Sequence, residues 1–192
     1  PPRSTLFPYT TLFRSNIMNE VLNTIAKRYS CRSFTAQAIE HEIVEALALA
    51  AIQAPSAMNR QPWQIIVIKD KSLIDEMDVY GMTQLDEINH KRMMDQGGKM
   101  FYHAPLMFVI AKKGNKDLDC GIVAQNITLA ATSLGLGSVI CAYAHTAFKN
   151  EVYREKLLPK EYEFGISVLV GYPAAHSGTA HEVNLDKIRY IA

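Results

Sequence analysis

Four short apolar runs recur along this chain, and helical or loop-like segments separate each run from the next. The runs cover residues 63–68, 106–111, 138–143 and 164–171 and are rich in Val, Ile, Leu and Phe. Runs of this length and composition predict strands that are covered on both faces. Strands that alternate with helices predict a three-layer, mixed α/β arrangement, and 192 residues fit a single domain.

Apolar side chains recur at helical spacing between these runs. The expected helices cover residues 19–28, 40–53, 117–134 and 149–157, with further helix inside residues 71–100. Pro55 ends the second of them, because proline cannot continue a helix. Asp117 and Asp119 stand where a helix N-terminus favours acidic groups, and Gly135 stands where a helix commonly ends.

The charge is nearly balanced, with 20 Lys and Arg against 19 Asp and Glu. A general nucleic-acid binder or a protein bound to anionic membranes carries a clear basic excess, so we expect neither kind of partner. No apolar run reaches the ~18 residues of a membrane span.

Cys31, Cys120 and Cys141 are widely spaced and form no C-x-x-C pair, and no His stands at zinc-ligand spacing from them. We expect them to be small buried side chains in a reducing compartment. This predicts a cytoplasmic protein without a metal site.

Residues 1–15, PPRSTLFPYTTLFRS, have no regular period and lack the apolar segment of a signal peptide. They resemble a translated sequencing adaptor. We therefore expect a non-native, disordered tail, a native start near Met18, and a domain over residues 16–192.

The common hydrolytic and phosphate-binding motifs are absent from the sequence, which has no G-x-S-x-G, no H-E-x-x-H and six scattered histidines. The glycines of residues 135–138 follow a helix and precede a strand, which is the reverse of the order in a dinucleotide-binding loop. We name no catalytic acid, base or nucleophile.

Three polar clusters stand at the edges of apolar elements. In the first, Arg28, Ser30 and Arg32 point the same way if the segment is extended. Two guanidiniums and a hydroxyl on one side suit an anion such as a phosphate. A solvated basic strand is the alternative at this point.

The second cluster lies in the Pro-, Ser- and Asn-containing segment 55–63. Asn59 and Gln61 each offer a donor and an acceptor, which suits the edge of a pyrimidine-like ring, although a plain loop before a strand fits as well. The third cluster, Lys187 and Arg189, indicates little by itself, because terminal charges are usually solvated.

Together these clusters resemble the nitroreductase superfamily, whose members are FMN-binding flavoproteins. The matching segments stand in the family's order and are residues 27–34 (KRYSCRSF), 54–63 (APSAMNRQPW), 125–131 (QNITLAA), 134–138 (LGLGS), 169–173 (LVGYP) and 187–189 (KIR). The resemblance covers the chain from residue 19 to its end.

The resemblance implies a role for each cluster. The first, which includes Tyr29, binds FMN: Arg28 and Ser30 hold the phosphate and ribityl end, and Arg32 lies near N1 and O2 of the flavin. A cation there stabilises the negative charge that reduced flavin develops. Lys187 and Arg189 return to the phosphate.

The remaining implied contacts concern the flavin ring. Asn59 and Gln61 bond the pyrimidine edge at N3 and O4, and Pro55 and Ser56 line the same site. The isoalloxazine packs against Ile140, Cys141 and Ala142. This last segment departs from the Trp or Pro-x-Glu-Gly patterns that are common in the family.

The resemblance further implies an α+β fold with a mixed, mainly antiparallel central sheet flanked by helices, in an intertwined bacterial homodimer with FMN at the interface. The apolar helix 117–134 suits that interface. The implied activity is ping-pong transfer from NADH or NADPH, the transient donor, to a nitroaromatic, quinone or similar small-molecule acceptor. A flavin-binding redox protein without turnover, specialised chemistry such as dehalogenation or flavin fragmentation, and a flavin-free structural homodimer are the alternatives.

Overall fold

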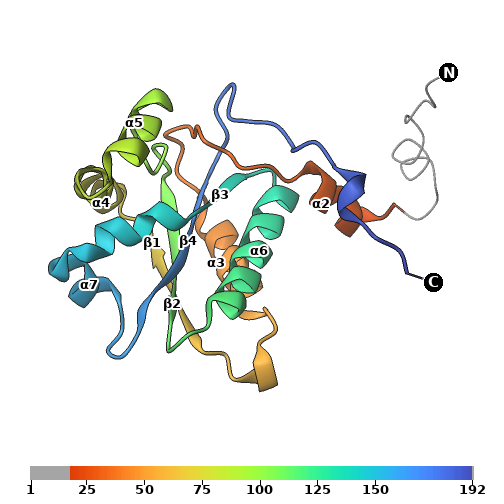
Figure 1. Cartoon of the computed structure of the whole chain (residues 1–192), viewed down its shortest axis with the longest axis horizontal. Coiled ribbons are helices and arrows are strands. Elements are labelled where there is room, and N and C mark those ends of the chain that lie inside the picture. The colour runs from red at the N-terminus through yellow and green to blue at the C-terminus, as the bar shows by residue number, and fades with distance from the viewer. Residues whose placement is uncertain (1–17, 192) are drawn as a thin grey trace.

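The computed structural model describes residues 18–191, in which four strands form one sheet (Figure 1). The strands are β1 (Trp63–Ile68), β2 (Leu106–Lys112), β3 (Gly137–Cys141) and β4 (Glu163–Gly171). They stand in the order β1-β2-β4-β3, and every neighbouring pair is antiparallel. The expectation of a separate tail over residues 1–15 falls outside the described residues.

This topology corrects one expectation drawn from the strand pattern alone. The fold is α+β rather than α/β, because parallel pairing among the described residues is confined to an isolated bridge between Ser30 and Ser138. β1 is an edge strand whose apolar side chains reach both cores, for example Trp63 on one face and Ile68 on the other, whereas Gln64 is exposed. The mainly antiparallel sheet implied by the family resemblance is confirmed.

The expected helices are present at nearly the expected bounds. They are α2 (Glu20–Lys27), α3 (His41–Ile52), α4 (Lys71–Thr83), α5 (Glu87–Asp95), α6 (Asp117–Ser133) and α7 (Glu151–Leu157). Three 3₁₀ segments complete the description: η1 (Ala57–Asn59), η2 (Ala142–Lys149) and η3 (Leu185–Lys187). Residues 142 and 143 begin η2 instead of extending the third strand, because pairing with β4 ends at Cys141 and Ser167.

Successive side chains of β2 alternate between two hydrophobic cores, as a strand covered on both faces requires. Phe108 and Ile110 pack with α3 and α6 on one face of the sheet. Met107 and Val109 pack with α4 and η2 on the other face. Figure 1 shows the resulting three layers, with α5 and α7 on the side of α4.

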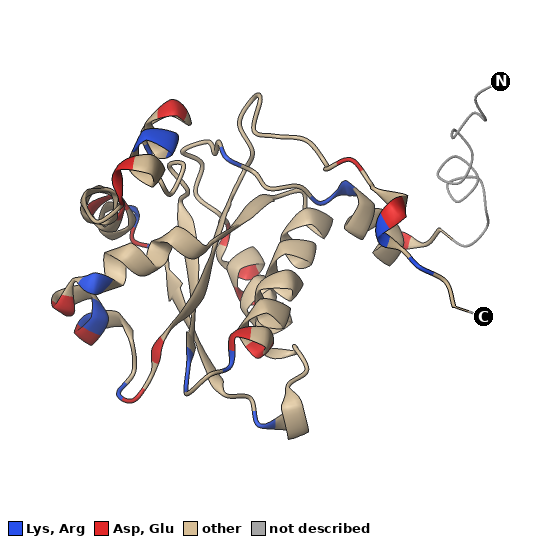
Figure 2. Cartoon of the chain, viewed as in Figure 1, with Lys and Arg blue, Asp and Glu red and all other residues tan. Residues whose placement is uncertain are grey.

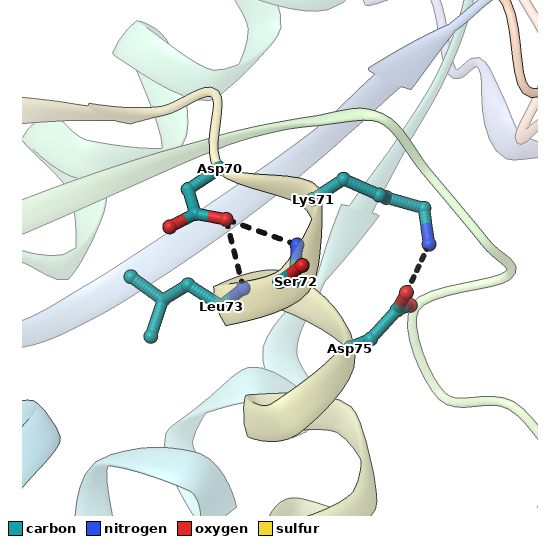
Figure 3. Close-up of polar contacts among 5 residues, drawn as sticks. All are labelled: Asp70, Lys71, Ser72, Leu73 and Asp75. Carbon is teal, nitrogen blue, oxygen red and sulfur yellow. Dashed lines mark hydrogen bonds and ion pairs between the residues drawn. The ribbon is translucent and has the colours of Figure 1, made fainter.

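Local contacts define the N-terminus of α4, the helix that precedes α5. Asp70 caps the helix, because its Oδ1 accepts hydrogen bonds from the backbone N–H groups of Ser72 and Leu73 at 3.0 and 3.2 Å (Figure 3). Lys71, the first residue of the helix, forms an ion pair with Asp75 one turn further along. These local contacts define where α4 begins.

Helix α6 spans the whole height of the sheet. Its inner residues Val123, Ile127 and Ala131 are buried, whereas Leu118 on its outer side is 80% exposed. After Asp119 the helix carries no charged residue, so its last turns are uniformly tan in Figure 2. No helix within residues 18–191 is long and apolar enough to cross a membrane.

Candidate functional site

The segment after α2 is held in an extended conformation by backbone hydrogen bonds on both sides. The N–H of Cys31 donates to the carbonyl of Ser138 at 2.9 Å, and the N–H of Arg32 donates to that of Ser177 at 2.8 Å. Cys31 is fully buried, whereas Arg32 is exposed, so side chains alternate as expected. Arg28 and Ser30 are half-buried on the same alternation as Arg32.

The C-terminal segment runs beside this stretch. The hydroxyls of Tyr29 and Ser177 are 2.9 Å apart, and the N–H of Ala174 donates to the carbonyl of Ser33 at 3.0 Å. A Cβ at Gly178 would lie 2.9 Å from the carbonyl oxygen of Ser30, so the close approach requires glycine there. Beyond it, Lys187 and Arg189 are exposed, and the described residues show no hydrogen bond or ion pair between them and Arg28.

A cavity of about 180 Å³ opens where β3 ends. It is lined by Arg32, Arg92, Met93, Gln96, Tyr102, Val139, Ile140, Cys141, Ala142 and Tyr143. The structure therefore brings together Arg32 and residues 140–142, which stand more than a hundred positions apart in the sequence.

Six lining residues were missed from the sequence: Arg92, Met93, Gln96, Tyr102, Val139 and Tyr143. Tyr102 is held by an unusual backbone, because it and His103 have positive φ angles of 52° and 60°. Such conformations are costly for residues other than glycine and cluster at functional sites. The apolar pattern that marks strands and helices carries no signal for side chains that meet only after folding.

Buried contacts position Tyr102. The N–H of Met100 donates to Oδ1 of the buried Asp78 at 2.9 Å, and the Tyr102 hydroxyl donates to Oε1 of Gln96 at 3.4 Å. Burial raises the pKa of Tyr102, and the nearby Arg32 guanidinium opposes that shift. Tyr102 is therefore a neutral hydrogen-bonding group at the cavity wall.

The loop with Pro55, Ser56, Asn59 and Gln61 is strained and exposed. Met58, Asn59 and Gln61 have positive φ angles, and the Gln61 N–H donates to Ser56 Oγ at 2.9 Å. Nε2 of Gln61 donates to Oδ1 of Asn59 at 3.0 Å. Among the described residues, this pairing leaves Nδ2 of Asn59 as a free donor and Oε1 of Gln61 as a free acceptor.

This loop lies at the far end of α6 from the Arg28–Arg32 segment. The N–H of Ala57 donates to Asp119 Oδ1 in the first turn of α6, at 3.3 Å. At the other end, α2 faces Leu129 and Ser133 across a groove. From Asp119 to Ser133 a helix advances about 20 Å at 1.5 Å per residue. One chain does not bring the two clusters together.

Comparison with known proteins decides the family. The model of the nitroreductase family matches residues 25–172. The chain belongs to the nitroreductase family. The family and the α+β fold predicted from the sequence are thereby confirmed.

Among solved structures, this family member is similar to a nitroreductase with bound FMN from Desulfitobacterium hafniense, at 42% identity and a TM-score of 0.87, over 92% of this chain and 100% of that one. It is also similar to an FMN-dependent nitroreductase of Clostridium difficile, at 28% identity and a TM-score of 0.73, over 90% and 99%. An FMN reductase (NAD(P)H) of Bacillus subtilis is 30% identical over 83% of this chain and 68% of its own length.

The burial of Cys141 at the cavity wall predicts that its thiol reacts slowly with alkylating reagents. Burial raises the pKa of Cys141 to about 12 and that of Cys120 to about 11, so both are neutral thiols at pH 8. We expect iodoacetamide to leave Cys141 unlabelled in the native protein at pH 8, because the thiolate is the reacting form. Mass spectrometry of labelled peptides measures this.

The control is the same reaction in denaturant, where all three cysteines should label. Fast labelling of Cys141 in the native protein would show that this wall is open and ionised, contrary to the structure.

Proposed function

We propose that this nitroreductase-family protein binds FMN and uses NADH or NADPH to reduce nitroaromatics, quinones or similar acceptors by ping-pong transfer. The observation that carries the proposal is the meeting of Arg32 with residues 140–142 at one cavity, in a chain of this family. Family membership supports the reaction class, and the cavity supports this location for the reaction in the chain.

The residues present fit the phosphate end of FMN. Arg28 and Ser30 stand on the outward side of an extended segment whose inward side chain, Cys31, is fully buried. Within residues 18–191 no carboxylate lies at ion-pair distance from Arg28 or Arg32. Guanidiniums without an acidic partner suit a phosphate. Tyr29 fixes the segment, and Lys187 and Arg189 complete the cationic set.

The loop residues fit the ring end. Within residues 18–191 the paired amides of Asn59 and Gln61 leave one donor and one acceptor free, and a ring edge that carries C=O and N–H needs both kinds of group. Ser56 holds this geometry through its bond from the Gln61 N–H, and Pro55 precedes it. Ile140 is 40% exposed at the cavity, so it and its neighbours Cys141 and Ala142 offer an apolar surface for a flat ring.

FMN supplies the redox chemistry when bound: it takes hydride from NAD(P)H, which leaves as NAD(P)⁺, and gives two electrons to the acceptor. Arg32 places a fixed positive charge where negative charge develops on the ring. The neutral Cys141 and Tyr102 exclude water from the wall without adding charge. No side chain of this site is required as a catalytic acid or base.

A homodimer completes the site. The single-chain cavity of about 180 Å³ is smaller than the ~300–1,000 Å³ of pockets that enclose a ligand of drug size. A twofold axis that packs α6 antiparallel on its copy brings the first turn of one helix beside the last turns of the other. The Asn59 loop of one chain then meets the Arg28 segment of its partner.

The outer face of α6 suits this packing, because Leu118 is exposed beside Gly121 and Ile122 in a shallow groove. The buried, free cysteines suit the reducing cytoplasm.

The function is tested by the visible spectrum of the purified, dialysed protein, followed by anaerobic addition of NADH and then NADPH. A flavin spectrum that bleaches with either donor supports the proposal. A bound flavin that neither donor reduces favours a redox protein without turnover or specialised flavin chemistry. Colourless protein that takes up no added FMN refutes the site.

Arg28→Ala should weaken FMN binding, because it removes a charge-assisted contact to the phosphate. The expected loss is about 1.5–3 kcal/mol, or roughly 10- to 150-fold in Kd. Titration of apoprotein with FMN, followed by flavin fluorescence, measures the change.

Lys27→Ala is the matched control, since it removes the exposed cation one position earlier. Its Kd should stay within about threefold of the wild type. Equal affinities for Arg28→Ala and the wild type would remove Arg28 from the site.

Leu118→Arg should dissociate the dimer, because it places an unpaired charge in an apolar interface at a cost of about 3 kcal/mol or more. Val152→Arg on α7 is the control, because Val152 is 66% exposed on the opposite side of the sheet. Sedimentation velocity should show a monomer that retains FMN poorly for Leu118→Arg and a dimer for Val152→Arg. Two dimers, or a monomeric wild type, would refute the α6 interface.

A further inference from the structure

One wall of the cavity is made of residues to which the proposed flavin contacts assign no part. Arg92 and Met93 on α5, with Gln96 after it and Tyr102 beyond, line the same cavity as Ile140–Ala142. These residues come from the segment between β1 and β2, on the side of the sheet that carries α4. They therefore face the place where a second substrate approaches the ring.

This wall is positively charged and lacks a balancing acid. Arg32 and Arg92 are the charged residues among those that line the cavity, and within residues 18–191 neither forms an ion pair with a carboxylate. Both guanidiniums act on Tyr102. Burial raises the pKa of Tyr102 overall, and the positive charges of Arg32 and Arg92 oppose part of that rise. A cavity with one sign of charge and low-dielectric walls attracts ligands of the opposite sign.

Contacts on both sides of Arg92 hold α5 in place. Its N-terminus is capped by Asp86, whose Oδ1 accepts from the N–H of Asn89 at 2.9 Å. The hydroxyl of Tyr143, a cavity residue, donates to Oδ1 of Asn89 at 2.6 Å. Met93, the next residue after Arg92, is 2% exposed and anchors the helix in the core. These contacts fix the helix that carries Arg92, whose exposed side chain lines the cavity.

Arg32 is proposed to serve the flavin ring, and within residues 18–191 Arg92 has no acidic partner. We propose that Arg92 determines specificity for acceptors that carry an anionic group, such as a carboxylate on an aromatic ring. The Tyr102 hydroxyl and the Gln96 amide supply hydrogen bonds beside it. This inference rests on the proposed function and names the acceptor class of the same site.

The test compares two acceptors of equal shape, 4-nitrobenzoate and 4-nitrobenzamide, with the FMN-loaded dimer. Bleaching of the flavin by NADH is measured first, so a failure of the proposed function appears before any acceptor is added. The rate at which each acceptor reoxidises the flavin is then measured by stopped flow, at low and at high salt.

Wild-type protein should prefer the carboxylate by about tenfold or more in second-order rate constant, and salt should reduce the preference. Arg92→Gln should remove most of the preference by slowing the carboxylate alone, while bleaching by NADH stays within about twofold. Lys91→Gln is the matched control: it removes an exposed cation one position away on α5 that does not line the cavity. It should keep the preference.

Three results would overturn the proposal. The first is a wild type that does not distinguish the two acceptors. The second is an equal loss of preference in Lys91→Gln, which would indicate general surface charge. The third is an Arg92→Gln variant that slows bleaching by NADH and leaves the acceptor ratio unchanged, because Arg92 would then bind the phosphates of the donor.

Discussion

The rigid span of α6 is the constraint on which the site depends. Its 17 residues pack against the sheet along one side, and a helix of that length advances about 25 Å. The Asn59 loop is tied to its first turn through Asp119, and the Arg28 segment lies near its other end. If both segments bind one flavin, as proposed, a second copy of that helix has to bring them together.

The net charge of the cavity wall depends on which of its groups are ionised. Cys141 and Tyr102 are neutral because burial raises their pKa values. The charge at this wall therefore comes from guanidiniums, one at the end of the N-terminal extended segment and one on α5. In the proposed function the first serves the ring of the cofactor and the second selects the acceptor, so one cavity would hold both tasks.

Much of the fold was predictable because the apolar pattern is regular. β2 reads as a continuous apolar run and alternates between two cores, and α6 begins at Asp117 as the acidic residues indicate. The edge position of β1 and the 3₁₀ turns of η2 depend on strand order and tertiary packing, which no local pattern encodes. Arg32 and residues 140–142 were predicted as parts of one site from the family resemblance, and the structure brings them to one cavity.

The wall formed by Arg92, Gln96 and Tyr102 could not be predicted from the sequence pattern. Arg92 looks like any exposed cation on a polar helix, and the left-handed backbone at Tyr102 has no glycine to mark it. The separation of the Asn59 loop from the Arg28 segment was also hidden, because it follows from the direction of α6 between them.

A mixed dimer tests the central claim most directly. One chain carries Arg28→Ala, and the other, with a different tag, carries Asn59→Ala together with Gln61→Ala. If each site combines the Arg28 segment of one chain with the Asn59 loop of the other, the mixed dimer contains one intact site and one doubly altered site. The account predicts that it retains about one FMN after dialysis while both parent homodimers lose theirs. A mixed dimer that retains no more FMN than its parents would contradict it.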